Sequence, residues 1–294
     1  MNLEGRRRSS NVEDRRGMSS GAKFGLGGGA TGIILMLILS YCSGGNLDLG
    51  SLIGQMGQMG QVEQTAPGEQ QFSAEEQELV EFSEKILAGT EDVWTKIFRE
   101  EGLGEYQPPK LVFYTDQTPT GCGTGQAAMG PFYCSADQCL YIDLSFFLQM
   151  KKQLGADGDF AYAYVIAHEV GHHVEYLTGI LGKVHQQMSK YGQNSAQSNA
   201  LSVRLELLAD FYAGVWAHHD NKLYSSLEDG DLEEAIDCAQ KIGDDYLQKR
   251  AQGYAMPESF THGTSAQRMR WLKLGLRTGD IRQGRTFEVP ESQL

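Results

Sequence analysis

The sequence predicts an α+β fold that is mostly helical, with a small sheet before the main helices and an apolar anchor near the N-terminus. Apolar residues recur at helical spacing in several long segments after residue 72, whereas only 110–116 and 140–144 have the composition of strands. No charged residue lies between Phe24 and Gly44. At 40% hydrophobic content, the 294 residues can build a sizeable core once flexible segments are set aside.

The charge is uneven along the chain. Residues 1–24 carry six basic and three acidic groups, although the whole chain has a net charge of −13. Because phosphate binding requires a basic surface, the acidic body argues against a nucleic-acid partner.

The first 71 residues predict membrane attachment. We expect a disordered, cytoplasmic basic tail at 1–23, a single transmembrane anchor at 24–42 and a Gly/Gln-rich linker at 43–71. A cleaved signal peptide is one alternative, but "SYCSGG" is a poor cleavage site, and a buried soluble segment is another. Arginines before the apolar run favour a cytoplasmic N-terminus and an exported domain, on the periplasmic or extracellular side.

The folded domain is expected at 72–294. Ser73 and Glu76 form a capping-box pattern that begins the first helix, and a second helix is expected after "AGTED". A strand is expected at 110–116, and "LYIDL" is a second strand that leads into a short helix. Further helices are expected at about 158–177, 196–219, 229–252 and 265–280.

Cysteine usage agrees with export. Cys122, Cys134 and Cys139 fall in a glycine-rich segment, and we expect a disulfide between Cys122 and Cys134. A zinc knuckle is the competing interpretation, but this set lacks a fourth ligand and a nearby histidine. Free buried thiols are the third alternative.

The segment "YVIAHEVGHHVEYL" (164–177) predicts half of a metal site. His168 and His172 are four residues apart, so they share one face of a helix and can bind one zinc ion. Glu169 is placed to contact a water on the metal and act as general base. Gly171 is costly inside a helix, which indicates that another segment packs closely against its backbone.

The remaining ligand is expected on another helix. "RLELLADFYAG" places Glu206 and Asp210 four apart among apolar residues. We expect Glu206 to bind the metal and Asp210 to accept a hydrogen bond from a ligand histidine. A solvated glutamate is the alternative, but its apolar neighbours argue against it.

The sequence resembles a known family, the neutral zinc metallopeptidases of bacteria, or YpfJ-like proteins. The resemblance covers nearly the whole chain and includes "TPTGCGTGQAAMGPFYCSADQCLYIDLSFF", "AHEVGHHVE", "SNALSVRLELLADFYAGVWAH" and "FTHGTSAQRMRWLKLGLRTGD". It implies a zincin-like, gluzincin-type peptidase with His168, His172 and Glu206 on zinc and Glu169 as base. Cys139 and Cys238 look like additions to the family pattern, and they either pair or remain free.

The sequence leaves the roles of several other residues open. His173 is either a helper or a packed histidine. The donor to the developing oxyanion is one of His262, Tyr212, Tyr246 and Tyr254, and His262 is also the next candidate for a metal ligand. "LYIDL" is either an ordinary strand or an edge strand that binds an extended peptide.

The predicted function is that of a membrane-anchored zinc peptidase acting on protein or peptide substrates. One alternative is a zinc-binding envelope scaffold without catalysis, although a structural zinc has no use for an adjacent base such as Glu169. The other is a cell-wall amidase.

Overall fold

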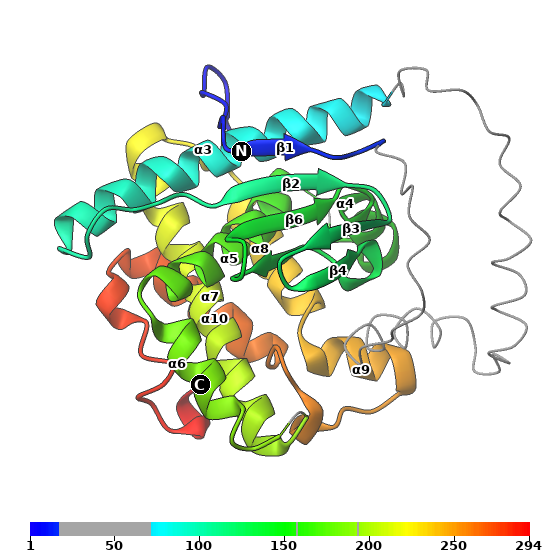
Figure 1. Cartoon of the computed structure of the whole chain (residues 1–294), viewed down its shortest axis with the longest axis vertical. Coiled ribbons are helices and arrows are strands. Elements are labelled where there is room, and N and C mark those ends of the chain that lie inside the picture. The colour runs from blue at the N-terminus through cyan, green and yellow to red at the C-terminus, as the bar shows by residue number, and fades with distance from the viewer. Residues whose placement is uncertain (18–71, 157, 193) are drawn as a thin grey trace, which may run out of the picture.

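The computed structural model of the chain describes residues 1–17, 72–156, 158–192 and 194–294 (Figure 1). The expected anchor at 24–42 and linker at 43–71 lie outside these residues. Within the described part of the chain, no helix has the length and apolar character needed to cross a membrane.

The described strands form two sheets. The larger has the order β1 (Val12–Asp14), β2 (Lys110–Tyr114), β6 (Cys139–Asp143) and β5 (Phe132–Cys134). The first three strands are parallel, and β5 runs antiparallel to β6. A separate hairpin pairs β3 (Gln117–Thr120) with β4 (Gly123–Gln126). The predicted strands at 110–116 and in "LYIDL" correspond to β2 and β6.

Helices make up most of the described chain, as the sequence predicts. In Figure 1, α5, α7 and α10 lie together on one side of the larger sheet, and α3 runs beside β1. The helices are α3 (Ala74–Glu100), α4 (Ser145–Gln149), α5 (Asp159–Leu177), α6 (Ile180–Met188), α7 (Ala196–Tyr224), α8 (Asp231–Lys241), α9 (Asp244–Gln252) and α10 (Ser265–Thr278). Short helical turns occur at η2 (Ala127–Met129), η3 (Met150–Leu154), η4 (Pro257–Ser259), η5 (Ile281–Gln283) and η6 (Glu291–Gln293).

The N-terminal segment is part of the fold. The Leu111 amide donates to the Asn11 carbonyl at 2.8 Å, and the Arg15 amide donates to the Phe113 carbonyl at 2.8 Å, so β1 completes the sheet beside β2. Arg6 donates two hydrogen bonds to the buried Asp220 carboxylate, at 2.8 and 3.2 Å. The expectation of a disordered tail is therefore wrong for residues 1–17, because these groups find partners far away in sequence.

The first helix is continuous, and the expected break after "AGTED" does not occur. The Ser73–Glu76 capping box begins α3 as predicted. Gly89 lies in the middle of this helix, where a Cβ atom would lie 2.5 Å from Arg6 Nη2 and 2.7 Å from Asp220 Oδ1. This glycine makes room for a buried ion pair instead of ending the helix.

Two other expectations about segments are wrong. The helix expected at 229–252 is two helices, α8 and α9, separated at Gly243. A Cβ atom on Gly243 would lie 2.4 Å from the Ser265 amide nitrogen, so close backbone packing redirects the chain there. "LYIDL" is not an edge strand, because β6 pairs with β2 on one side and β5 on the other. The free edge of the larger sheet on this side belongs to β5.

The cysteine prediction is confirmed for one pair. Cys122 and Cys134 form a disulfide that joins the loop after the β3 strand to the end of β5. Cys139 and Cys238 are each buried and free. The zinc-knuckle alternative therefore lacks two of its thiolates.

Close backbone contact brings α5 against α7. A Cβ atom on Gly171 would lie 2.9 Å from both the Cα and the carbonyl oxygen of Ala209. The expectation that another segment packs against Gly171 is confirmed. This contact lies one turn from the residues that the sequence predicts as metal ligands on both helices.

Replacing Gly171 by Ala should lower the free energy of unfolding by about 1–3 kcal/mol, because the added methyl group overpacks this contact. Gly182→Ala in α6 is the matched control, since a Cβ atom there meets nothing within 4 Å. It should raise stability by up to about 1 kcal/mol through helix propensity alone. Chemical denaturation of the full chain measures both, and a Gly171→Ala protein as stable as wild type would contradict the close packing.

Candidate metal centre

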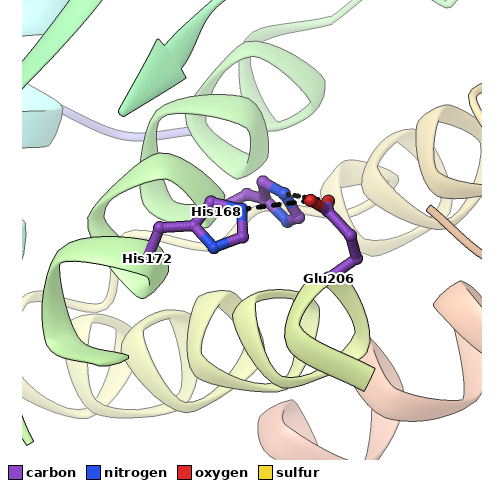
Figure 2. Close-up of side chains that lie close together, drawn as sticks. All are labelled: His168, His172 and Glu206. Atoms are coloured by element: carbon purple, nitrogen blue, oxygen red, sulfur yellow. Dashed lines mark hydrogen bonds and ion pairs between the residues drawn. The ribbon is translucent and has the colours of Figure 1, made fainter. Parts of the chain in front are cut away.

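Two helices supply the candidate metal ligands. His168 and His172 project from buried α5, and Glu206 projects from α7 toward both imidazoles (Figure 2). The four-residue spacing on α5 places the two rings edge to face, with their centroids 4.9 Å apart. The structure thus brings together the three residues that the sequence singled out.

The spacing of the ligand atoms suits a small metal ion. Glu206 Oε2 lies 3.2 Å from His168 Nε2, and Glu206 Oε1 lies 3.6 Å from His172 Nε2. All candidate ligand atoms lie within 4.8 Å of one another. Tetrahedral zinc with bonds of about 2.0–2.1 Å would hold such atoms about 3.3 Å apart. Two imidazoles and one carboxylate form a donor set typical of catalytic zinc, with one position left for water.

The electrostatics favour an ionised Glu206. Burial by itself would raise the pKa of this carboxyl, but the nearby imidazoles of His172 and His262 and the hydrogen bond from His168 hold it well below its usual range. Glu206 therefore offers a charged oxygen to a cation.

Each candidate histidine ligand is held from behind by a buried carboxylate. His168 Nδ1 lies 2.8 Å from Asp210 Oδ1, which is the hydrogen bond that the sequence predicts. His172 Nδ1 lies 3.0 Å from Glu175 Oε2, and both carboxylates have no exposed surface. Each contact keeps the proton of its ring on Nδ1 and leaves Nε2 free to bind a metal.

The role of Glu175 was missed by the sequence analysis. The available signal was its spacing, because Glu175 lies three residues after His172 and therefore on the same helix face. Burial raises the pKa of Glu175 to about 7, although His172 opposes this shift. Its Oε1 atom is buried and has no hydrogen-bond partner among the described residues.

Glu169 stands beside the cluster without joining it. It is 8% exposed and lies near enough to His168, His172 and Glu206 for each of their charges to affect it. Burial raises the pKa of Glu169, against the effect of the two histidines and a hydrogen bond from the Tyr133 backbone. Tyr133 belongs to β5, so the edge strand lies next to this carboxyl group.

His173 is a packed histidine. Its side chain has no exposed surface, and its Nδ1 and Nε2 atoms lie 2.9 Å from the Tyr133 hydroxyl and 2.7 Å from the Gln107 carbonyl. Burial lowers the pKa of His173 to about 4, so the ring is neutral, and Nε2 donates while Nδ1 accepts. This histidine fastens β5 to α5.

Among the four candidate oxyanion donors, His262 is the best placed. Tyr212 is buried in the core, with its ring 5.4 Å from that of Trp94, and Tyr254 is 58% exposed. Tyr246 lies 3.4 Å from Arg250 through its hydroxyl group. Desolvation opposes the charged form of His262, but Glu206 and Asp244 raise its pKa. The effect of Glu206 indicates that His262 lies near the candidate metal ligands. Its Nδ1 lies 3.2 Å from Asp244 Oδ1.

Comparison with known proteins supports a metal site of this kind. The sequence pattern of the family described as "Putative neutral zinc metallopeptidase" matches residues 1–287. The chain is 50% identical over 292 residues to "Uncharacterized protein YpfJ" of Escherichia coli K12, covering 98% of this chain and 99% of that protein. It is 39% identical over 199 residues to "Uncharacterized protein Rv2575" of Mycobacterium tuberculosis, covering 64% of this chain and 66% of that protein. No solved structure gives a significant match.

Zinc retention should separate the two glutamates of the centre. Glu206→Gln should lose zinc on dialysis, because a neutral amide replaces the charged ligand, whereas Glu169→Gln should keep wild-type zinc content. Asp210→Ala and Glu175→Ala should each weaken zinc affinity about 10–100-fold. Metal analysis after dialysis of the full chain measures all four. Zinc retained by Glu206→Gln but lost by Glu169→Gln would reverse the assigned roles and make His262 the next candidate ligand.

Proposed function

We propose that this chain, which belongs to the family of neutral zinc metallopeptidases, hydrolyses peptide bonds by using a water molecule that Glu169 deprotonates. One observation carries the proposal. Two imidazoles and the Glu206 carboxylate lie within reach of one ion, and the buried Glu169 lies beside this cluster. A purely structural zinc site would have no use for that additional acid.

His168, His172 and Glu206 would hold the zinc ion. Zinc in such a site supplies a Lewis acid and lowers the pKa of a coordinated water toward about 7. Glu169 accepts the proton of the water as the oxygen attacks the carbonyl carbon, and it then delivers this proton to the leaving amine. The raised pKa of Glu169 supports this role, because a general base works best when its pKa lies near the working pH.

His262 would donate to the oxyanion that develops on the attacked carbonyl. Asp244 supports this role by fixing the ring and its loop. Its Oδ2 atom accepts hydrogen bonds from the amides of Thr261, His262 and Gly263, at 2.8, 2.7 and 3.1 Å. With Nδ1 turned to Asp244, the Nε2 atom of His262 is left for substrate.

An extended peptide substrate would lie along β5. This strand forms the free edge of the larger sheet on this side, and its Tyr133 backbone already hydrogen-bonds Glu169. Main-chain pairing with an edge strand holds a peptide with little regard to its sequence. β5 therefore replaces "LYIDL" in this role.

The same proposal places the enzyme at a membrane and outside the cytoplasm. The uncharged run within 24–42 supports membrane attachment. The Cys122–Cys134 disulfide supports an oxidising compartment, such as the periplasm or the extracellular side.

Zinc-loaded full-length protein should cleave an unstructured protein substrate, and a chelator should abolish cleavage. Glu169→Gln should lower kcat about 10²–10⁴-fold while zinc stays bound. His262→Ala should lower kcat about 10²–10³-fold through loss of the oxyanion donor. Tyr254→Phe is the control and should leave the rate unchanged. Mass spectrometry of the products gives the rates, and full activity in Glu169→Gln would refute the proposed mechanism.

A further inference from the structure

The Asp210 carboxylate has more partners than its histidine alone. Its Oδ1 atom accepts from the Tyr164 hydroxyl at 2.5 Å and lies 2.8 Å from His168 Nδ1. Arg268 of α10 donates from Nε to Oδ2 and from Nη2 to Oδ1, both at 2.9 Å. Asp210 is fully buried and Arg268 is 3% exposed. The carboxylate is thus held in one orientation by an arginine fork.

Arg268 is itself fixed in place. Its Nη2 atom also donates to the Tyr164 hydroxyl at 3.2 Å, and Nη1 donates to the Ile242 carbonyl at 3.4 Å. Lysine could supply the charge here but not the two parallel bonds, since the planar fork belongs to arginine.

We propose that Arg268 is a positioning residue for the metal centre, which acts through Asp210 to fix the ring of His168 with Nε2 directed toward Glu206. Arg268 binds Oδ2 of Asp210 and shares Oδ1 with Tyr164 and His168, so the carboxylate cannot rotate away from the imidazole. This inference rests on the zinc site of the proposed function, but it does not depend on peptide cleavage.

A second buried ion pair provides the matched control. Arg6 binds Asp220 through two nitrogens in the same manner, with both side chains at most 8% exposed. This pair joins the N-terminal segment to the far end of α7. Arg6→Gln and Arg268→Gln should both lower the unfolding temperature of the metal-free chain, because each leaves a buried carboxylate without its cation.

The test is zinc affinity of the full chain, measured by competition with a chromogenic chelator. Arg268→Gln should weaken zinc binding about 10–100-fold, Arg268→Lys should be intermediate, and Arg6→Gln should bind as wild type does. Arg268→Lys keeps the buried positive charge, so it keeps the test open if Arg268→Gln fails to fold. Unchanged zinc affinity in the folded Arg268 variants would overturn the proposal. A zinc-binding wild type that cleaves no peptide would overturn only the proposed function.

The described residues on either side of 18–71 lie close together. The Arg16 guanidinium lies 4.0 Å from the centroid of the Phe72 ring, so the chain leaves the fold and returns to it at one place. Before that point, β1 is a parallel neighbour of β2, and Ser9 and Asn11 both bond to Glu91 of α3. The N-terminal segment and the domain form one folded unit.

The basic residues of this segment are committed to ion pairs. Arg6 pairs with Asp220, Arg7 with Asp92, and Arg8 with Glu84. These partners belong to the domain, so the arginines are not a free basic cluster that would hold the N-terminus in the cytoplasm. Segment 43–71 contains Asp48, Glu63 and Glu69 and offers no second uncharged run of about 20 residues.

We therefore infer that residues 1–17 and 72–294 lie on the same side of the membrane. This inference replaces the expected arrangement with a cytoplasmic N-terminus and an exported domain. It also predicts that the N-terminus is retained, because cleavage after residue 44 would remove β1 and leave β2 as an edge strand.

Cysteine accessibility in intact cells tests this inference. Ser10→Cys and Ser292→Cys are placed separately in a Cys42→Ser background, because both serines are exposed while Cys139 and Cys238 are buried. In intact cells, a membrane-impermeant maleimide should label either both positions or neither of them. If it labels neither, permeabilisation should allow both to be labelled. Labelling of detergent-solubilised protein controls for accessibility. Labelling of one position alone in intact cells, or loss of residues 1–17 from the mature chain by mass spectrometry, would overturn the inference.

Discussion

The buried carboxylate of Asp210 is the contact on which the candidate site depends. It joins three helices that are distant in sequence, through His168 and Tyr164 on α5, its own position on α7, and Arg268 on α10. A carboxylate without exposed surface is tolerated only with full hydrogen bonding and a compensating charge. Arg268 and His168 supply both, and they lower the pKa of Asp210 to about 2 although burial alone would raise it.

Such a contact requires the helices to approach closely. Gly171 lets α5 approach the backbone of Ala209 on α7. Two glycines allow the same close approach between α7 and α10. A Cβ atom on Gly214 would lie 2.2 Å from the Leu272 carbonyl oxygen, and one on Gly275 would lie 2.0 Å from the Phe211 carbonyl oxygen. Helices usually pack about 8–10 Å apart, depending on the side chains between them, and glycine gives the lower end of that range. Glycines on three helices therefore set the distances across which the polar network forms.

The two candidate histidine ligands are supported in different ways. Asp210 carries a neutralising arginine and uses both of its oxygens. Among the described residues, the Glu175 carboxylate bonds to His172 alone, and its Oε1 atom has no partner. Spacing along one helix could have indicated Glu175, but nothing local could indicate Arg268, which lies 58 residues after Asp210. Long-range partners of this kind are invisible to pattern analysis because the pattern extends over one helix only.

The local elements could be predicted from short-range signals in the sequence. The capping box of α3, the strands β2 and β6, the helices α5 and α7 and the spacing of His168, His172 and Glu206 follow from side-chain periodicity and short-range hydrogen bonding, which act within one or two turns. Packing between distant segments, in contrast, keeps Gly89 inside one helix, makes β5 the free edge, and pairs basic residues 6–8 with the domain. Those features depend on the groups that pack from elsewhere in the chain, and a glycine or an arginine has the same local signal with or without such a partner.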